Sequence, residues 1–578
     1  MHTLRRFTIA LATAVTAVAS GCKSSDSTGP SAPLPVLGLS ATATGSAAVR
    51  VTFSGRAGES YDIERAEGAS GAFAVVNSTA TLAADATQTY NDAGLKPTTL
   101  YRYRVTTIKS GARTPSAETS TTTLPFGNAA ATISTDITSS RTLYADTAYT
   151  LSGFIHVANG ATLTIQPGTT IKGDYNTLGS MLMVLRGAKI QAVGTADAPI
   201  VFTSSRPAGQ RQPGDWGGLV LVGNAPNNRN GQVAIEGSGT DGNTVVGGKN
   251  YTVIYNGGNV ATDNSGTLAY VRVEFAGFAP IQDNEFNAFT FAAIGSGTRA
   301  SYLEALNGLD DSYEFFGGGF DLDHLIAFET ADDMFDMSEG FSGRIQFAIG
   351  INTVQLTPRT GAGFYSVDLE GIENDGCNGT GCDLGFDSAP FTIPLIANFT
   401  LIGCGQASCF GAGGGHGLML RRGTGGYYVN GVVARFTTDG ISLRDAATYT
   451  RAGSTPTPSA TADLQIRNIL FAETPKLFQA ASATQFALDS VPNGLNFSAA
   501  TAASLFTAIP AVGSAPTSIA AFDFSPVAGS AITTGGLATF TGAIATKAGT
   551  FVTGTSYVGA VAPGGAKWWQ GWTTYARN

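Results

Sequence analysis

The sequence predicts an all-β protein, in which an N-terminal β-sandwich is followed by a right-handed parallel β-helix with coils of roughly 22 residues. Three observations predict this fold: an internal repeat, an unusual composition, and many short strands of alternating apolar residues. Gly accounts for 74 of the 578 residues, and charged residues for only 13%. Such a composition suits short strands joined by tight turns, whereas helical repeats need more helix-forming residues.

The repeat is clearest in residues 302–350, which match themselves after a shift of 22 residues. One coil of a β-helix has two open edges and an apolar face that it cannot bury alone, so coils of equal length stack. The positions that align are Leu303, Leu325 and Phe347; Ala305, Ala327 and Ile349; Asp310 and Asp332; Asp311 and Asp333; Tyr313 and Phe335; and Glu314 and Asp336.

Residues 1–22 have the features of a lipoprotein export signal. Arg5 and Arg6 give a positive start, and the apolar stretch at 7–19 is too short to span a bilayer. Residues 19–22 resemble a bacterial lipobox, which implies that Cys22 is lipidated and anchors the protein to the outer membrane or cell surface. The alternative is an ordinary signal peptide, which would give a secreted protein. Residues 23–35 are a Ser/Pro-rich linker that would hold the folded part away from the membrane.

Residues 36–124 contain alternating short strands and a motif of known type. The segment 94–105 resembles the fibronectin type III signature G-L-x-P-x-T-x-Y-x-Y-x-V. The resemblance implies a β-sandwich in which Tyr101 forms the tyrosine corner, its hydroxyl returning to backbone a few residues upstream. Phe53 would take the place of the family's core tryptophan. Because the segment has no Arg-Gly-Asp motif, a spacer role is favoured over receptor binding.

Residues 125–578 are assigned to the β-helix. Period-2 apolar alternation broken by Gly-containing turns marks strands in 155–173, 182–194 and 199–204. Residues 231–266, rich in Gly, Asn and Thr, are expected to form an insertion, and 502–509 a short helix. The Trp-rich segment 568–575 is expected to cap the last coil, where strand edges would otherwise be open; an aromatic platform for sugars is the alternative.

Several motifs in this region resemble a family of bacterial surface lipoproteins built on a right-handed parallel β-helix. They lie at residues 167–173, 186–195, 214–218, 310–318, 420–424 and 557–573. The resemblance implies the fold and a surface location, and it implies no particular activity.

Four cysteines remain beside Cys22, as two pairs with the same spacing: Cys377 with Cys382, and Cys404 with Cys409. Three pairings are open to four cysteines. The export signal favours two local disulfides, because disulfides persist in oxidising compartments. A zinc site made by all four thiolates is the alternative.

The candidate functional site is an acidic ladder formed by Asp310, Asp311, Glu314, Asp332, Asp333 and Asp336. Stacked strands lie about 4.8 Å apart, so carboxylates one coil apart would repel each other and need compensation. A Ca²⁺ ion would supply it, since Ca²⁺ takes six to eight oxygen ligands. The alternatives are aspartates that bond only turn amides, and a catalytic acid cluster.

A catalytic version of the site would resemble that of the β-helix pectate lyases, which use Asp-bound Ca²⁺ and a basic residue that abstracts a proton. The basic candidates near the ladder are Arg299 and Arg344. A second acidic patch invites the same interpretation near the first cysteine pair; it comprises Asp368, Glu370, Glu373, Asp375 and Asp383.

The composition narrows the function without fixing it. A net charge of −9 and the lack of a basic stripe argue against nucleic acid as a partner. No metalloprotease, Walker or nucleophile-elbow motif is present. The first hypothesis is therefore a lipid-anchored, non-catalytic scaffold at the cell surface that binds glycan or matrix. The alternatives are a polysaccharide lyase or glycoside hydrolase, and a self-assembling surface-layer or fibre component.

Overall fold

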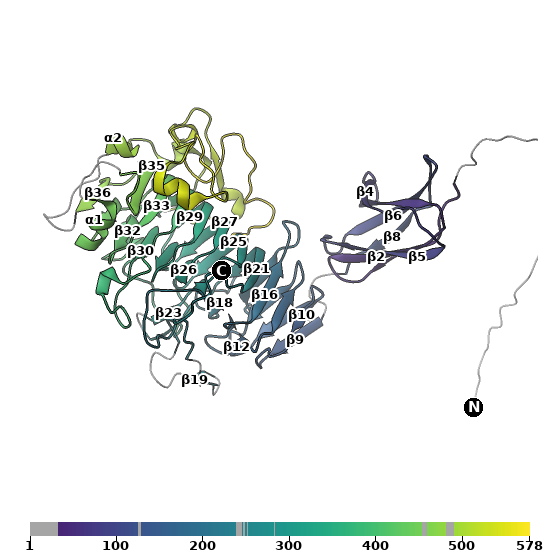
Figure 1. The fold of residues 1–578 in the computed structure, drawn as a ribbon, viewed down its shortest axis with the longest axis horizontal. Helices are drawn as coiled ribbons and strands as arrows, with labels where there is room; N and C mark the ends of the chain where they lie inside the picture. The colour runs from purple at the N-terminus through teal and green to yellow at the C-terminus, as the bar shows by residue number, and fades with distance from the viewer. Residues whose placement is uncertain are drawn as a thin grey trace, which may run out of the picture.

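The computed structural model describes residues 33–124, 129–238, 245–246, 249–250, 252–281, 284–453, 459–480 and 490–578. The predicted export signal with Cys22, and residues 23–32 of the predicted linker, lie outside these residues. Figure 1 shows a small β unit followed by a long stack of strands. None of the described helices combines the length and the hydropathy that crossing a lipid bilayer requires.

The N-terminal unit is a sandwich of two antiparallel sheets. One sheet has the order β1 (Leu37–Ala43), β2 (Ala48–Gly55), β5 (Ala86–Ala93); the other contains β3 (Ser60–Glu67), β4 (Ala74–Ser78), β6 (Leu100–Lys109), β7 (Ala112–Pro115) and β8 (Thr119–Thr122). Phe53 is buried in the core against Tyr61, as its predicted role requires. The Tyr101 hydroxyl accepts a hydrogen bond from the backbone N–H of Lys96 at 2.9 Å, the contact expected of a tyrosine corner. The fibronectin type III assignment itself stays a prediction.

The strands from β9 to β37 form a right-handed parallel β-helix with two long sheets. The fifteen-stranded sheet contains β9 (Ala129–Ile133), β10 (Arg141–Leu143), β11 (Thr147–Leu151), β13 (Thr162–Ile165), β14 (Thr170–Gly173), β16 (Lys189–Val193), β17 (Ile200–Ser204), β21 (Gly266–Glu274), β25 (Arg299–Gly308), β27 (Asp321–Thr330), β29 (Arg344–Ile351), β31 (Leu395–Ile402), β33 (Gly426–Ala434), β35 (Leu464–Ala472) and β37 (Asn496–Ser498). The ten-stranded sheet contains β12 (Phe154–Val157), β15 (Met181–Val184), β18 (Gly218–Val222), β24 (Phe289–Ile294), β26 (Tyr313–Gly318), β28 (Phe335–Ser338), β30 (Ile372–Asp375), β32 (His416–Arg421), β34 (Asp439–Leu443) and β36 (Phe478–Ala480).

Short elements lie in the loops. They are β19 (Val245–Val246), β20 (Lys249–Asn250), β22 (Phe278–Ile281), β23 (Asn284–Phe286), β38 (Phe506–Ala508), β39 (Asp523–Pro526), α1 (Ala446–Ala452), α2 (Ser490–Asn493), α3 (Ala502–Leu505), α4 (Gly542–Ala548), and the 3₁₀ turns η1 (Gly385–Asp387), η2 (Ala407–Cys409), η3 (Ile519–Ala521) and η4 (Ala531–Thr533). The short helix expected within 502–509 is thus half helix and half strand. Strands β19 and β20 lie in the expected insertion, and the helix resumes at β21.

Each long strand of the fifteen-stranded sheet bends once, so that one strand serves two faces of the coil. The strands β16 and β17 both pair with β21, on either side of Tyr270, whose φ is 50°. The same left-handed conformation recurs in the following coils, at Tyr302, His324 and Phe347. With the ten-stranded sheet as the third face, each coil closes around a continuous apolar core.

The predicted register is correct for one coil and wrong by one residue for the next. Leu303 pairs with Leu325, as predicted, but Leu325 pairs with Ala348 rather than Phe347. Ala327 likewise pairs with Gly350 rather than Ile349. The second step is 23 residues long because the extra residue is accommodated before β29, where Asp321 pairs with Arg344.

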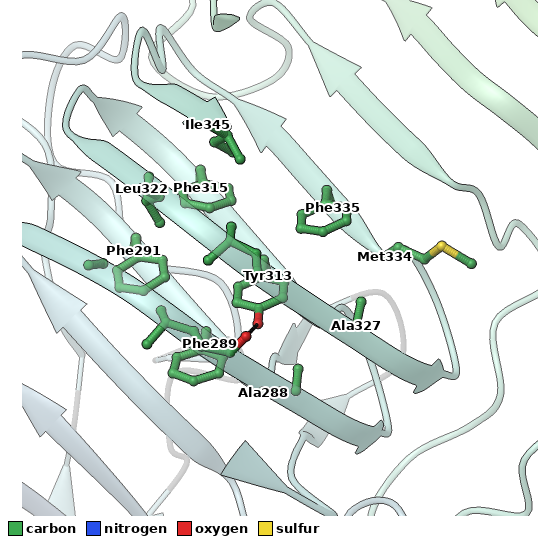
Figure 2. Packing of buried hydrophobic residues seen from close by; sticks show 14 of the residues in the cluster. Ala288, Phe289, Phe291, Tyr313, Phe315, Leu322, Ala327, Met334, Phe335 and Ile345 are labelled. Atoms are coloured by element: carbon green, nitrogen blue, oxygen red, sulfur yellow. Dashed lines mark hydrogen bonds between the residues drawn. The ribbon is translucent and has the colours of Figure 1, made fainter. Parts of the chain in front are cut away.

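Aromatic side chains stack along the axis of the helix core (Figure 2). The rings of Phe289, Tyr313 and Phe335 are parallel, with centroids 5.2 Å apart at each step. The Tyr313 hydroxyl, although fully buried, donates toward the carbonyl oxygens of Leu303 and Ile326 at 2.8 and 2.9 Å. A polar group inside the core is therefore satisfied, and the predicted alignment of Tyr313 with Phe335 is confirmed.

The C-terminal segment covers the side of the β-helix, and the expectation that 568–575 caps the last coil is wrong. Trp569 and Trp572 are buried in a cluster with outward-facing residues of several coils, among them Phe328. Arg272, on an early coil, donates to the Trp572 carbonyl at 3.2 Å. The physical reason is that this outer face is apolar and needs cover, and the buried tryptophans are not free to serve as a sugar platform.

Candidate functional site

The six residues of the acidic ladder meet in one cavity of about 680 Å³ on the outer side of the ten-stranded sheet. Part of the second acidic patch joins them, namely Asp368, Glu373 and Asp375. The remaining acidic residues of the lining are Glu236, Glu285 and Glu339, and its basic residues are Arg229, Arg421 and Arg422. Twelve carboxyl groups thus face three guanidinium groups, which leaves nine negative charges if all are ionised.

The β-helix register places three of these carboxylates in a row. Glu314 on β26 pairs with Asp336 on β28, which pairs with Glu373 on β30. Their strand neighbours Phe315 and Met337 point into the core, so alternation sends the three carboxylates outward. Adjacent strands are about 4.8 Å apart, and the row is therefore a column of close like charges.

The turn aspartates form a second, inner row with a structural role. Asp311 accepts the backbone N–H of Asp333 at 2.7 Å, and Asp333 accepts that of Glu370. Glu370 in turn accepts the backbone N–H of His416 at 2.7 Å. Each side chain thus satisfies an amide of the next coil. The turn interpretation is confirmed for one oxygen of Asp311 and of Asp333, and it does not account for the other carboxylates.

Four buried carboxylate oxygens of the cavity lining have no hydrogen-bond donor among the described residues. They are Oε1 of Glu314, Oδ1 of Asp332, Oδ1 of Asp336 and Oε2 of Glu339. The Glu314 side chain belongs to a residue only 3% exposed. A buried ionised oxygen without a donor is costly, so a proton, a water molecule or a cation beside these four atoms would be stabilising.

The carboxylates form three overlapping triads whose ligand atoms lie within 4.8 Å of one another. The triads are Asp310, Asp311 and Asp332; Asp311, Glu314 and Asp336; and Asp333, Asp336 and Glu373. Two oxygens bound to one Ca²⁺ at about 2.3–2.6 Å are at most about 5 Å apart. The spacing therefore fits cation ligands, and Asp311 and Asp336 each belong to two triads.

Several carboxyl groups of the cavity have pKa values above those of ordinary carboxyl groups, so they hold their protons more tightly. Burial raises the pKa of Asp311 to about 6, although the hydrogen bonds with Glu314 and the Asp333 amide oppose this. Burial, followed by repulsion from Asp375, raises the pKa of Glu373 to about 8, against the attraction of Arg421 and Arg422. Burial and neighbouring carboxylates also hold the pKa of Glu314 well above its usual range.

The guanidinium groups of the cavity are paired with its carboxylates. Arg421 contacts Glu373 and lies 3.0 Å from Asp375, while Arg422 also contacts Asp375. The predicted basic residues, Arg299 and Arg344, do not line this cavity. Arg299 donates to nearby carbonyls, and Arg344 pairs with Asp321.

A family model described as a pectate-lyase-like β-helix domain matches residues 135–509. The chain belongs to this pectate-lyase-like β-helix family. A search of curated proteins found no match. Among solved structures, the chain is similar to the sensor domain of the anti-sigma factor RsgI4 of Pseudobacteroides cellulosolvens, with 19% identity over 16% of this chain and 92% of that one. The TM-score of 0.12 is too low for this likeness to support any argument.

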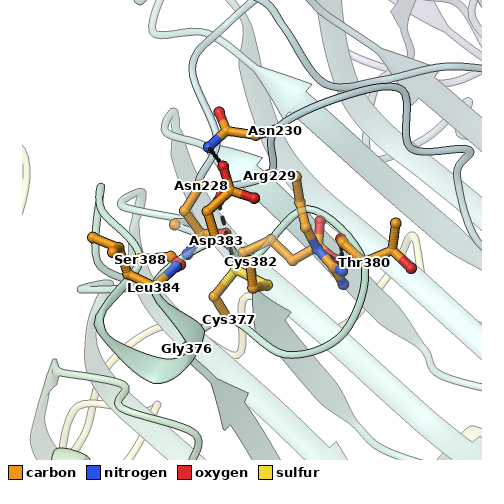
Figure 3. Close-up of a disulfide and its surroundings, with 12 residues drawn as sticks. Asn228, Arg229, Asn230, Gly376, Cys377, Thr380, Cys382, Asp383, Leu384 and Ser388 are labelled. Carbon is orange, nitrogen blue, oxygen red and sulfur yellow. Dashed lines mark hydrogen bonds and ion pairs between the residues drawn. A yellow bond between two sulfur atoms is a disulfide. The ribbon is translucent and has the colours of Figure 1, made fainter.

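In this pectate-lyase-like β-helix, the first disulfide closes the short loop that Figure 3 shows. Cys377 is bonded to Cys382, and Cys404 to Cys409, so local pairing is confirmed and the thiolates are not zinc ligands. The neighbouring Gly376 and Asn378 line the cavity. Disulfides are typical of exported or extracellular proteins.

The disulfide loop is tied to Arg229 and Asn230, which directly precede the expected insertion at 231–266. Arg229 donates to the Thr380 carbonyl and to Glu339, the latter at 2.7 Å. Asn230 donates to Asp383 at 2.8 Å, which holds Asp383 at the loop and outside the cavity lining (Figure 3). Residues 229–236 therefore close the site from one side.

Sequence reasoning missed six charged residues of the lining: Arg229, Glu236, Glu285, Glu339, Arg421 and Arg422. Arg229 and Glu236 come from irregular loops and Glu285 from the short strand β23, and the coil repeat predicts no position for any of the three. Glu339 carried a usable signal, because it follows Asp336 by three residues and comes directly after β28. An acidic residue at the end of an already acidic strand could have been added to the ladder.

Proposed function

We propose that this pectate-lyase-like β-helix protein is an exported surface protein that binds extracellular polysaccharide through divalent cations, Ca²⁺ first, held in the acidic cavity. Export is supported by the two disulfides. Lipidation of Cys22 would anchor the chain, and the N-terminal sandwich, in our proposal a fibronectin type III spacer, would hold the β-helix away from the membrane.

The observation that carries the proposal is the set of three overlapping carboxylate triads. Each offers three oxygen ligands at a spacing that fits Ca²⁺, and the shared Asp311 and Asp336 would bridge neighbouring ions. Carboxylate-rich sites with irregular geometry suit Ca²⁺ better than Mg²⁺, which requires near-octahedral coordination and retains its water. Bound cations would also satisfy the unpartnered oxygens of Glu314, Asp332 and Asp336.

The rim of the cavity supplies a second element of glycan binding. Phe364 and Val367 line the cavity and are 69% and 66% exposed. An exposed aromatic ring beside a polar site can pack against the C–H face of a sugar. Between them, the Tyr365 hydroxyl donates to the Cys409 carbonyl at 2.6 Å, which fixes the loop beside the second disulfide. Sugar oxygens would complete the coordination of the cations.

A non-catalytic role is favoured because each arginine of the cavity is already paired with a carboxylate. A proton-abstracting base needs a side chain free to reach the sugar carbon. A polysaccharide lyase is the second candidate, since Arg421 lies beside the cation triads. A glycoside hydrolase would instead use two carboxyl groups of different pKa, and Asp311 and Glu373 are the pair to consider.

A glycan array with purified protein, in Ca²⁺ and in chelator, tests the proposal. We expect binding to a subset of polysaccharides that disappears in chelator. The bound polysaccharides are then incubated with protein and assayed for new reducing ends and unsaturated products. Binding without product supports the scaffold, whereas product formation would replace it with an enzyme. Binding that is unchanged by chelator would overturn the cation-dependent mechanism.

Self-assembly into a surface layer or fibre is the remaining alternative. It would require open coil ends that recognise each other. Analytical ultracentrifugation of the same protein measures this directly. A monomer over the concentration range of the array would remove the alternative, while concentration-dependent polymers would support it.

A further inference from the structure

A second cavity, of about 930 Å³, lies between α4 and the outer side of the β-helix. It shares no lining residue with the acidic cavity. One wall is formed by the turns that lead into β27, β29 and β31, and the other by residues 542–547 of α4. Its size is in the range of cavities that enclose small organic ligands.

The wall that faces α4 is largely apolar. Phe320 and Tyr427 are 2% and 5% exposed, and Phe391 and Ile393 are half-buried beside them. Apolar and aromatic walls with a few convergent polar groups are typical of small-molecule sites. This lining is mainly apolar, whereas that of the acidic cavity is mainly charged, so the two cavities would select different ligands.

One positive charge in this cavity lacks a carboxylate partner. Arg344 binds both oxygens of Asp321, each at 2.7 Å, so that pair is neutral as a unit. The Lys547 ammonium donates to the Ser342 carbonyl, and no carboxylate of the described chain lies within ion-pair distance of it. The lining therefore carries one net positive charge on a protein whose net charge is −9.

The position of Lys547 is fixed by the helix that carries it. Ile544 and Ala548, on the same helix, are buried against Leu395 and Tyr427. Arg344 donates to the Ala548 carbonyl at 2.9 Å and so satisfies the end of α4. The ammonium is therefore placed at the cavity wall by a packed element, and it meets the apolar side chains from the opposite side.

We propose that this cavity binds a small amphipathic carboxylic acid, with its carboxylate on Lys547 and its aliphatic or aromatic body against Phe391, Ile393 and Tyr427. A carboxylate supplies the charge that the cavity lacks, and partial burial strengthens such a pair. Burial of the apolar body would favour binding by about 25 cal/mol for each Å² of apolar surface withdrawn from water.

The pH dependence of binding follows from the same arrangement. Burial, followed by the nearby Arg344, lowers the pKa of Lys547 to about 8, and Asp321 opposes this. Arg451 of α1 lies over the Phe391 ring and is paired with Asp387, so it adds no free charge. Above pH 8 Lys547 loses its charge, and affinity for the acid falls.

Titration calorimetry with decanoate, below its micelle-forming concentration, tests the site on the full chain. We expect binding at pH 7, at least a tenfold loss of affinity in Lys547→Met, and near-normal affinity in Lys547→Arg. Decanol, which lacks the charge, should bind at least tenfold more weakly than decanoate. Asp332→Asn, in the acidic cavity, should leave the affinity unchanged, so this test is independent of the polysaccharide proposal.

Two results would overturn the assignment: no decanoate binding to the native chain, or equal binding by a folded Lys547→Met variant. If that variant fails to fold, as judged by its thermal transition, the test rests on the pH dependence of decanoate affinity in the native chain. Decanoate remains ionised between pH 7 and pH 9.5, so a tenfold weaker affinity at pH 9.5 supports Lys547 as the partner. An unchanged affinity over this range would contradict it.

Discussion

The carboxylate of Asp311 accepts the backbone N–H of Asp333, one coil further along, at 2.7 Å. The same carboxylate belongs to two of the three carboxylate triads. One residue therefore belongs to two arrangements, a turn hydrogen bond and a carboxylate cluster, and different substitutions can separate them because an amide keeps the acceptor oxygen and loses the charge.

Asp311→Asn and Asp311→Ala should differ in their free energy of unfolding when both are measured in chelator. The amide keeps an acceptor for the Asp333 N–H and removes one charge from a repelling cluster, so the free energy of unfolding should stay level or rise. The alanine leaves a buried N–H without an acceptor and should cost about 1–3 kcal/mol. Urea unfolding of both variants measures the difference; equal stabilities would refute the turn role.

The stability of the protein should depend on pH and Ca²⁺ together. The folded-state pKa values of Asp311 and Glu373 are raised to about 6 and about 8, above their unfolded values near 4. Their stabilising contribution is therefore present below pH 4 and is lost as pH rises through 6 to 8. In chelator the unfolding temperature should fall over this range.

Adding Ca²⁺ should restore the stability that is lost as the carboxyl groups deprotonate, because the ion takes the place of the protons between them. At a concentration about 100-fold above Kd, one ion adds about 2.7 kcal/mol. The difference in unfolding temperature between Ca²⁺ and chelator should thus widen from pH 5 to pH 8, as differential scanning calorimetry would record. A difference that is constant or narrows with pH would show that protons and cations do not compete here.

Arg421→Met should increase the rise in unfolding temperature that Ca²⁺ produces. Loss of the guanidinium leaves Glu373 and Asp375 with less compensation, so the cation-free chain becomes less stable while the cation meets less competition. Arg344→Met is the matched control, since that arginine pairs with Asp321 at the other cavity. The shift in unfolding temperature on adding Ca²⁺ should grow in the first variant only; a smaller shift in Arg421→Met would mean that the arginine assists cation binding.

The C-terminal segment should detach when Trp572 is truncated. Trp572 is 1% exposed and packs edge-on against the stacked rings of Tyr270 and Tyr302. Trp572→Ala should cost about 3–5 kcal/mol and expose the segment to limited proteolysis. The half-buried Trp568 gives the matched control, for which a smaller effect is expected. Equal protection in the two variants would contradict the role of the segment as a side cover.

The coil repeat predicted the pairing of those site residues that lie one regular coil apart in the sequence. Glu314 and Asp336 were placed side by side because 22 residues separate them and strand alternation sends both outward. Glu373 pairs with Asp336 across 37 residues, because a long loop precedes β30, and no periodicity in the sequence predicts that pairing. Glu236 reaches the cavity from a turn and Glu285 from the short strand β23, and neither belongs to a repeating coil.

The position of the C-terminal segment was also beyond sequence reasoning. Its tryptophans indicated a buried surface, but the surface to be buried is formed by residues such as Ile326 and Phe328, which lie in strands with apolar residues on both faces. A strand buried on both faces does not show which neighbour covers its outer side. That information exists only once the coils are stacked.

The number of Ca²⁺ ions bound per chain tests the central claim most directly. Native protein stripped with chelator is dialysed against millimolar Ca²⁺ at pH 7.5, and the bound metal is measured by atomic emission. We predict two or more ions per chain, falling to at most one in Asp311→Asn/Asp336→Asn, since these two residues link the triads. No bound Ca²⁺ in the folded native chain, or the same number in the double variant, would contradict the account.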